Sequence, residues 1–174
     1  MPQYSEPVAP DPVDALREGW QAELADLDTS AMVTVALLNR SVGLLRRRID
    51  ERLAEAKATV GDFDVLSALR RQGPPYALKP SELARAIMLS PSGMTHRIDQ
   101  LEAAGLVERV VDPTSRRTAP VALTSAGIAA SERLARELVD EEQWALGALT
   151  SAEQKKLDSL LTKLIQANRA GRPT

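Results

Sequence analysis

The chain has 174 residues, 3% aromatic residues, no cysteine, one histidine and a formal net charge of -2. Without cysteine there is no disulfide framework or thiol sensor, and one histidine leaves too few nitrogen and sulfur ligands for zinc. No apolar run approaches the roughly 20 residues of a membrane span, and the acidic, proline-rich N-terminus is unlike a secretory signal. We therefore expect a cytoplasmic protein that works without a cofactor or a metal.

Two amphipathic helices are predicted to follow a flexible tail at residues 1–10. The first covers residues 11–27 and the second residues 30–57, because apolar residues recur at helical spacing through both segments. We assign residues 11–60 to dimerisation and to the ligand-binding side of the protein.

A winged helix-turn-helix lobe is predicted for residues 61–124. Its first helix covers residues 62–72 and ends at a Gly-Pro-Pro run. Pro80 suits the first position of a short second helix, and Ser90 and Pro91 suit the N-cap and first position of a third, which Gly105 closes.

The helix that follows Ser90 has one apolar and one polar face. Met94, Ile98 and Leu101 form the apolar stripe, and the opposite face is short and rich in hydroxyls, which suits a helix lying in a DNA major groove. From this helix and its cap we expect DNA contacts by Ser90, Pro91, Ser92, Thr95, His96 and Arg97. For Arg97, bracing the lobe is an open alternative.

Two short strands are predicted at residues 106–111 and 121–123, on either side of an Asp-Pro turn. Arg116 and Arg117 lie near the tip of this wing, where they could reach a minor groove or a phosphate. The slightly acidic net charge does not exclude DNA binding, because a locally basic face is sufficient. The expected fold is mainly α-helical with a small β-hairpin wing.

Residues 125–174 are predicted to form C-terminal dimerisation helices. Thr150 and Glu153 have the spacing of a capping box that begins the last helix. An apolar stripe follows at Leu157, Leu160, Leu161, Leu164 and Ile165. One small winged domain cannot cover this surface, so we expect a homodimer whose two recognition helices read a pseudo-palindromic operator in double-stranded DNA.

The stretch from Leu101 to Gly127 resembles the signature of the MarR family. The resemblance rests on LEAAGLVER at residues 101–109, Asp-Pro at 112–113, Arg-Arg at 116–117 and VALTSAG at 121–127. It implies a dimeric, ligand-responsive transcriptional repressor. Ser115 stands where the family usually has an acidic residue that helps to fix the wing, so this wing is expected to be less rigid.

Four residues are candidates for an effector site: Trp20, Asp64, Arg71 and Arg109. Asp64 and Arg71 are seven positions apart and therefore share one helix face. Two guanidiniums, an indole and a carboxylate suit a planar anionic ligand with N–H donors. These residue types resemble the urate-responsive branch of the MarR family, which implies release from the operator by urate or a related purine. A phenolic acid or a small carboxylate is the alternative effector.

Each of the four residues also has a structural interpretation. Trp20 could anchor a core or a dimer, Asp64 and Arg71 complement the dipole of their helix, and Arg109 could pair with a carboxylate. A winged-helix protein without an effector is therefore a second hypothesis. An enzyme is not expected, because the sequence has no glycine-rich phosphate loop and no paired-carboxylate site.

Overall fold

The computed structural model describes residues 12–87, 91–110 and 119–170, which fall into two compact units. The first unit is Met1–Arg47 and the second is Arg48–Thr174. Helix α1 (Pro12–Glu23) belongs to the first unit, and helix α2 (Ser30–Glu55) begins in the first unit and ends in the second. The backbone N–H of Ser30 donates to Asp28 at 2.9 Å, and this hydrogen bond lowers the pKa of Asp28.

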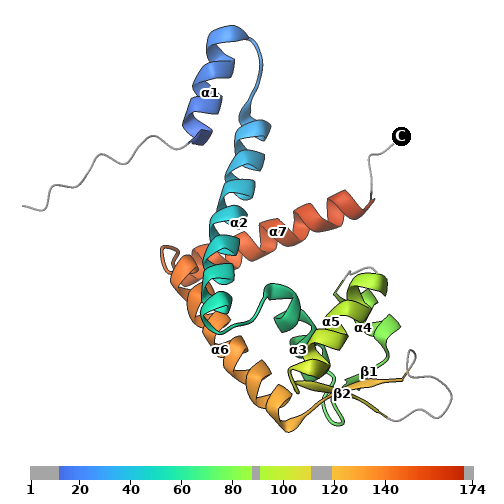
Figure 1. Ribbon diagram of the computed structural model, residues 1–174. Helices are drawn as coiled ribbons and strands as arrows, with labels where there is room; N and C mark the ends of the chain where they lie inside the picture. Colours follow the sequence, from blue (N-terminus) through green and yellow to red (C-terminus); the bar gives the residue numbers. More distant parts are fainter. Residues whose placement is uncertain (1–11, 88–90, 111–118, 171–174) are drawn as a thin grey trace, which may run out of the picture. The chain divides into compact units, whose positions relative to one another are not determined.

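The second unit contains the remaining helices and a small sheet. In chain order its elements are α3 (Val60–Arg70), β1 (Ala77–Leu78), α4 (Pro80–Ala86), α5 (Pro91–Ala103), β2 (Val107–Arg109), β3 (Val121–Leu123), α6 (Ser125–Leu146) and α7 (Ser151–Ala170). Figure 1 shows α3, α4 and α5 gathered beside the sheet, with α6 running along α3. The predicted mainly helical, winged fold is confirmed.

The core of the second unit lies between α3, α4, α5 and the sheet. Its most deeply buried side chains include Leu66, Leu69, Leu83, Met94 and Ile98, each at most 1% exposed. Burying each such side chain stabilises the fold by roughly 1.5–3 kcal/mol. The apolar stripe predicted for the helix after residue 90 is therefore confirmed as the face that α5 packs inward.

The wing sheet has three strands in the order β1-β3-β2, all antiparallel. The predicted hairpin of two strands is present as β2 and β3, and Val107 pairs with Leu123 in its ladder. The sequence analysis did not predict β1, in which Ala77 pairs with Ala122. A two-residue strand is too short to show an alternating pattern, and only its partner strand defines it.

Side-chain caps set the starts of α3 and α7. Helix α3 begins at Val60, two residues before the predicted start, because Thr59 is the N-cap and forms a capping box with Asp62. The capping box predicted before the last helix is confirmed: Glu153 accepts from the backbone N–H of Thr150 at 2.8 Å and from its hydroxyl at 2.7 Å.

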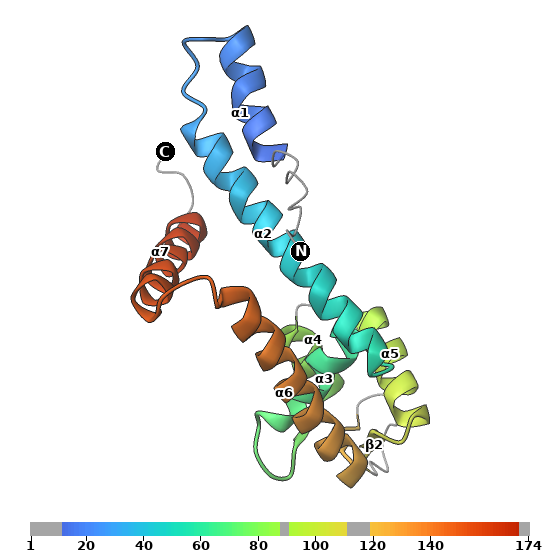
Figure 2. The same ribbon diagram turned by 90° about the vertical axis from the view of Figure 1, so that its left-hand side faces the viewer.

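Helix α7 follows α6 across a short turn (Figure 2) and buries none of its side chains. Leu160, Leu164 and Ile165 are about half exposed in the single chain. The predicted apolar stripe is thus present and uncovered. Within the described ranges, none of the helices is long and apolar enough to cross a membrane.

Candidate nucleic-acid interface and effector site

Helix α5 presents its polar face to the outside of the second unit. Thr95, His96 and Asp99 are exposed, whereas Met94 and Ile98 on the opposite face are at most 1% exposed. A helix anchored in this way can lie in a major groove without losing its packing on the core. Five of the residues predicted to contact DNA fall outside this description: Ser90, Arg116 and Arg117 entirely, and Pro91 and Ser92 in their side chains.

Arg97 points back from α5 to the start of α3. Its Nη1 donates to the hydroxyl of Thr59 at 2.8 Å and to Oδ1 of Asp62 at 2.9 Å. The ion pair is half-buried, with 26% of the Arg97 side chain and 19% of the Asp62 side chain exposed. Of the two roles left open for Arg97, this geometry favours bracing of the lobe.

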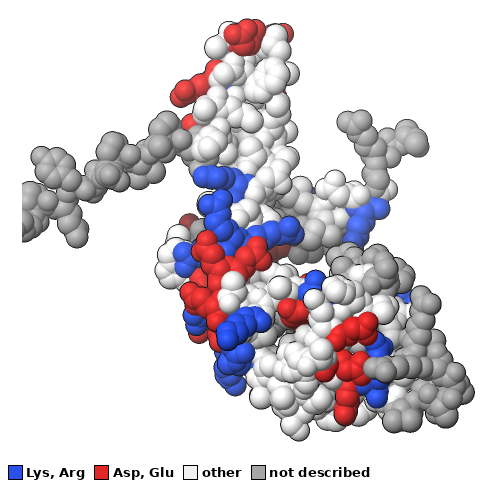
Figure 3. All heavy atoms as spheres, viewed as in Figure 1, with Lys and Arg blue, Asp and Glu red and all other residues white. Residues whose placement is uncertain are grey.

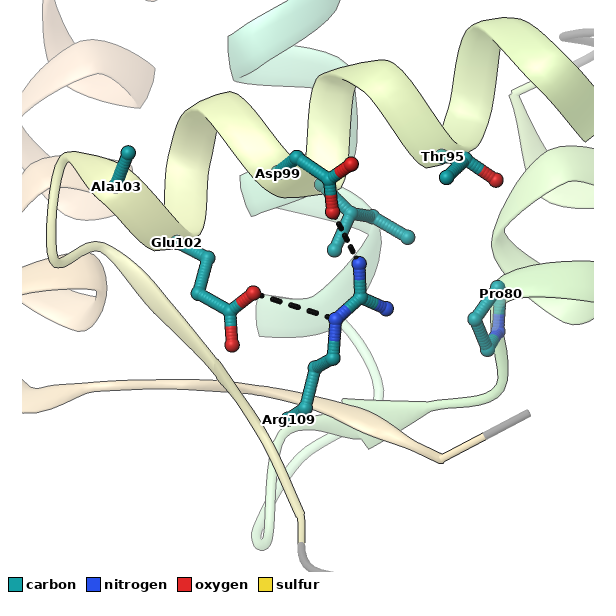
Figure 4. A pocket seen from close by; sticks show the side chains of 7 residues that line it. Pro80, Thr95, Asp99, Glu102, Ala103 and Arg109 are labelled. Carbon is teal, nitrogen blue, oxygen red and sulfur yellow. Dashed lines mark hydrogen bonds and ion pairs between the residues drawn. The ribbon is translucent and has the colours of Figure 1, made fainter. Parts of the chain in front are cut away.

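Arg109, at the end of β2, is held by two carboxylates of α5. Its Nη2 donates to Asp99 and its Nε donates to Glu102 at 3.3 Å (Figure 4), while only 10% of the side chain is exposed. The same guanidinium lines a hollow of about 720 Å³ between α4, α5 and β2, to which Pro80 and Thr95 also contribute. Arg109 therefore ties the wing to the recognition helix.

Asp64 and Arg71 share one face of α3, as their spacing predicts. Burial raises the pKa of Asp64, and the positive charges of Arg71 and Arg97 partly oppose that effect. Arg71 is the exposed C-cap of α3, and its Nε donates to the carbonyl of Ser67 at 3.2 Å. Within the described part of the chain, no hydrogen bond joins the terminal nitrogens of this exposed Arg71 side chain to another group.

The structure therefore brings Asp64 and Arg71 together, whereas Arg109 is paired with the two carboxylates of α5. Neither Asp64 nor Arg71 lines the hollow beside Arg109. Trp20 is 38% exposed and lies on α1 in the first unit, which is described separately from the second unit.

Many arginines of the second unit are engaged by carboxylates. Arg48 pairs with Glu141 at 2.8 Å, and Arg70 pairs with Glu132 at 2.6 Å. On the face shown in Figure 3, basic and acidic side chains of this unit lie side by side. Such pairs leave little positive charge for phosphates, so the electrostatic part of any DNA binding would have to come mainly from other basic groups.

Sequence reasoning gave bracing by Arg97 and pairing of Arg109 with a carboxylate as alternatives, but it named the partners of neither arginine. Thr59 and Asp62 have the spacing of a capping box, and that signal could have placed the start of α3 correctly. The pairing of Arg97 with Asp62, 35 positions earlier in the chain, has no local signal. No cluster of three or more His, Asp or Glu side chains in the described ranges could hold a metal ion.

Comparisons with known proteins decide the family. A family model described as the MarR family matches residues 58–118. The transcriptional regulator PecS of Dickeya dadantii is 34% identical over 152 residues, which are 87% of this chain and 92% of PecS. The chain belongs to the MarR family. It is a DNA-binding transcriptional regulator and not an enzyme.

Other members of the MarR family agree in sequence and in fold. The repressor Rv2887 of Mycobacterium tuberculosis is 31% identical over 74% of this chain and 90% of its own length. A mutant of MarR from E. coli, solved with operator DNA, has a TM-score of 0.65 and 27% identity, covering 80% of this chain and 98% of that one.

Two further solved structures extend the comparison. AbsC of Streptomyces coelicolor has a TM-score of 0.71 at 23% identity, over 83% of this chain and 97% of AbsC, and supports the fold alone. A structure of Bordetella bronchiseptica BpsR, whose DNA binding is regulated by 6-hydroxynicotinic acid, has a TM-score of 0.65 and 28% identity, covering 75% of this chain and 97% of that one.

Proposed function

We propose that this MarR-family regulator is a homodimeric repressor that reads a pseudo-palindromic operator with α5. The proposal further holds that a small aromatic anion, such as urate or a related purine, releases the repressor from DNA. The observation that carries the DNA-reading part is the exposed polar face of α5 at Thr95 and His96, opposite a fully buried stripe. DNA contacts by Ser90, Pro91, Ser92, Arg116 and Arg117 belong to the same proposal.

The homodimer is supported by apolar surface that a single chain leaves uncovered. Helix α7 buries no side chain, and Leu160, Leu164 and Ile165 are each 46–54% exposed. An amphipathic helix gains stability by burying such a stripe, and the same stripe on a second copy would be its self-complementary partner. Two recognition helices would then read two half-sites about one helical turn apart.

The effector site is built around Asp64 and Arg71 on α3. Arg71 would bind the negative charge of the ligand, and the half-buried Asp64 would accept from its N–H groups. Support for an aromatic anion comes from the likeness to BpsR, whose DNA binding answers to 6-hydroxynicotinic acid.

Arg109 suggests how the ligand could release the operator. The guanidinium now ties β2 to α5 through Asp99 and Glu102. For a ligand to act through Arg109, it must draw the guanidinium away from Asp99 and Glu102, which would loosen the wing from the recognition helix and so weaken DNA binding. By linkage, operator DNA would weaken binding of the ligand by the same factor.

Two alternatives share the DNA-binding part of the proposal. A phenolic acid or a small carboxylate, the chemical class of 6-hydroxynicotinic acid, could be the effector in place of a purine. The second alternative is a winged-helix regulator without an effector. In that case Asp64 and Arg71 only stabilise α3.

Thermal melting with urate, xanthine, protocatechuate, salicylate and citrate in parallel separates these possibilities. A ligand that binds only the folded state adds about 2.7 kcal/mol of stability at a hundredfold excess over its dissociation constant. We expect urate or xanthine to raise the midpoint, and Arg71→Ala to abolish the shift. A shift with protocatechuate, salicylate or citrate alone would support the second effector class. No shift with any compound would contradict the effector proposal.

A further inference from the structure

Arg97 is the residue through which α5 is attached to the N-terminus of α3. Its Nη1 reaches both Thr59 and Asp62, at 2.8 and 2.9 Å. Thr59 is the N-cap of α3, and Asp62 lies in its first turn. Because Leu66 and Leu69 are fully buried, helix α3, which carries Asp62, is anchored in the core.

The acceptors of Arg97 are held rigidly by one another. Oδ2 of Asp62 accepts from the Thr59 backbone N–H at 2.9 Å and from its hydroxyl at 2.7 Å. The same hydroxyl accepts from the Asp62 backbone N–H at 3.2 Å, in addition to the bond from Arg97. A hydroxyl has one proton and two lone pairs, so that of Thr59 is fully used. Moving Arg97 would therefore break its hydrogen bonds to Thr59 and Asp62, which also cap helix α3.

Gly61 completes the site that the Arg97 guanidinium occupies. A Cβ added at Gly61 would lie 2.5 Å from Cζ, 2.7 Å from Nη2 and 2.8 Å from Nε of Arg97. The guanidinium thus lies directly against the backbone of α3, where only glycine leaves room. Its Nε is buried there and has no hydrogen-bond partner in the described part of the chain. Burying an N–H donor without a partner costs free energy, so the surrounding contacts must hold the guanidinium in this position.

Arg97 lies between the exposed residues His96 and Asp99 on the recognition helix. A phosphate-binding arginine needs its charge available to the DNA, and here Asp62 already balances the charge at 2.9 Å. Attachment at this point fixes the direction of the residues that come just before it in α5.

We propose that Arg97 is a positioning residue of the recognition helix, seated on Thr59, Gly61 and Asp62, and that it contacts no DNA phosphate. Its role is to hold α5 at the angle that presents Thr95 and His96 to the operator. This inference rests on the proposed reading of the operator by α5.

Operator affinity as a function of salt concentration tests the proposal. The variants are Arg97→Gln, which removes the charge, and Gly61→Ala, which displaces the guanidinium and removes no charge. We expect both to weaken the complex by about three- to tenfold, the effect of losing one half-buried ion pair. We also expect both to leave the slope of log K against log salt unchanged.

Arg116→Ala in the wing is the comparison variant for a phosphate contact, and loss of such a contact lowers the salt slope by about 1. A slope that falls by about 1 in Arg97→Gln, with Gly61→Ala binding like the unchanged chain, would overturn the proposal. Melting temperatures of all variants separate loss of positioning from loss of folding.

Amide hydrogen exchange in the protein without DNA provides an independent readout. We expect faster exchange in the N-terminal half of α5 in both Arg97→Gln and Gly61→Ala, because the attachment to α3 is lost. Unchanged exchange in both variants would overturn the positioning role. Hydrogen exchange tests the positioning role of Arg97 even if the wild-type protein does not bind operator DNA. Failure of the wild-type protein to bind operator DNA would contradict the proposed function and not the positioning role.

Discussion

Arg109 at the end of β2 donates to Asp99 on α5, and this ion pair joins the wing to the recognition helix. Glu102 accepts from the same guanidinium at 3.3 Å. Only 10% of the Arg109 side chain is exposed, so its positive charge stabilises the lobe and is not freely available to a ligand. Any effector that uses Arg109 must therefore compete with two carboxylates.

The variant Arg109→Ala should imitate the ligand-bound state. Without the guanidinium, β2 is no longer tied to α5, so operator affinity should fall by about tenfold, the equivalent of 1.4 kcal/mol. Addition of urate should then produce no further release. Fluorescence anisotropy of a labelled operator measures both effects. Unchanged operator affinity in Arg109→Ala would show that the ion pairs do not control the DNA-binding geometry.

Asp64 should make the stability of the protein depend on pH. Burial raises its pKa in the folded chain, so the folded state binds a proton more tightly than the unfolded state does. Its ionised form therefore lowers stability at neutral pH, and that cost is relieved as the pH falls toward the usual carboxyl range, about pH 4.

We accordingly expect Asp64→Asn to melt slightly higher than the unchanged chain at pH 7, with the difference shrinking as the pH falls to about 4. Asp158→Asn, at an exposed position of α7, is the matched control. A clear decrease of the melting temperature in Asp64→Asn at pH 7 would mean that the Asp64 carboxylate stabilises the fold.

Gly127 cannot carry a side chain. A Cβ there would overlap the backbone carbonyl oxygen of Leu106, which cannot move without shifting the start of β2. Gly127→Ala should therefore lower the free energy of unfolding by at least about 2–3 kcal/mol. Gly43→Ala is the matched control, because open space surrounds Gly43 inside α2, and it should add about 0.5–1 kcal/mol. Equal melting temperatures for the two variants would contradict this contrast.

The exposed stripe of α7 should hold the homodimer together. Leu164→Asp places a charge in the stripe, and Gln166→Asp places the same charge two residues later. We expect analytical ultracentrifugation to give half the mass for Leu164→Asp and an unchanged mass for Gln166→Asp. A monomer should lose most of its operator affinity, because one recognition helix reads only one half-site. A stable dimer of Leu164→Asp would move the interface away from this stripe.

Periodicity and capping were sufficient to predict most of the helices. The apolar stripe of α5 and the capping box before α7 both follow from local spacing, and local spacing is what a sequence displays directly. Strand β1 could not be predicted, because two residues show no period and its pairing with Ala122 joins distant parts of the chain.

The candidate site was less predictable than the fold. The shared face of Asp64 and Arg71 follows from helix geometry alone. The partners of Arg97 and Arg109 do not, because each guanidinium bonds to side chains of another element. A long, flexible side chain can reach several partners, and only the packing of α3 and β2 against α5 decides which carboxylates it meets.

Release of operator DNA by urate tests the central claim most directly. The operator is first selected from random duplexes with the purified protein, and the labelled complex is then titrated with urate. Arg71→Ala is compared with Arg136→Ala, an exposed arginine of α6, as the matched control. The account predicts dissociation for the unchanged chain and for Arg136→Ala, and a complex that persists in Arg71→Ala. Dissociation of the Arg71→Ala complex at the same urate concentration would contradict it.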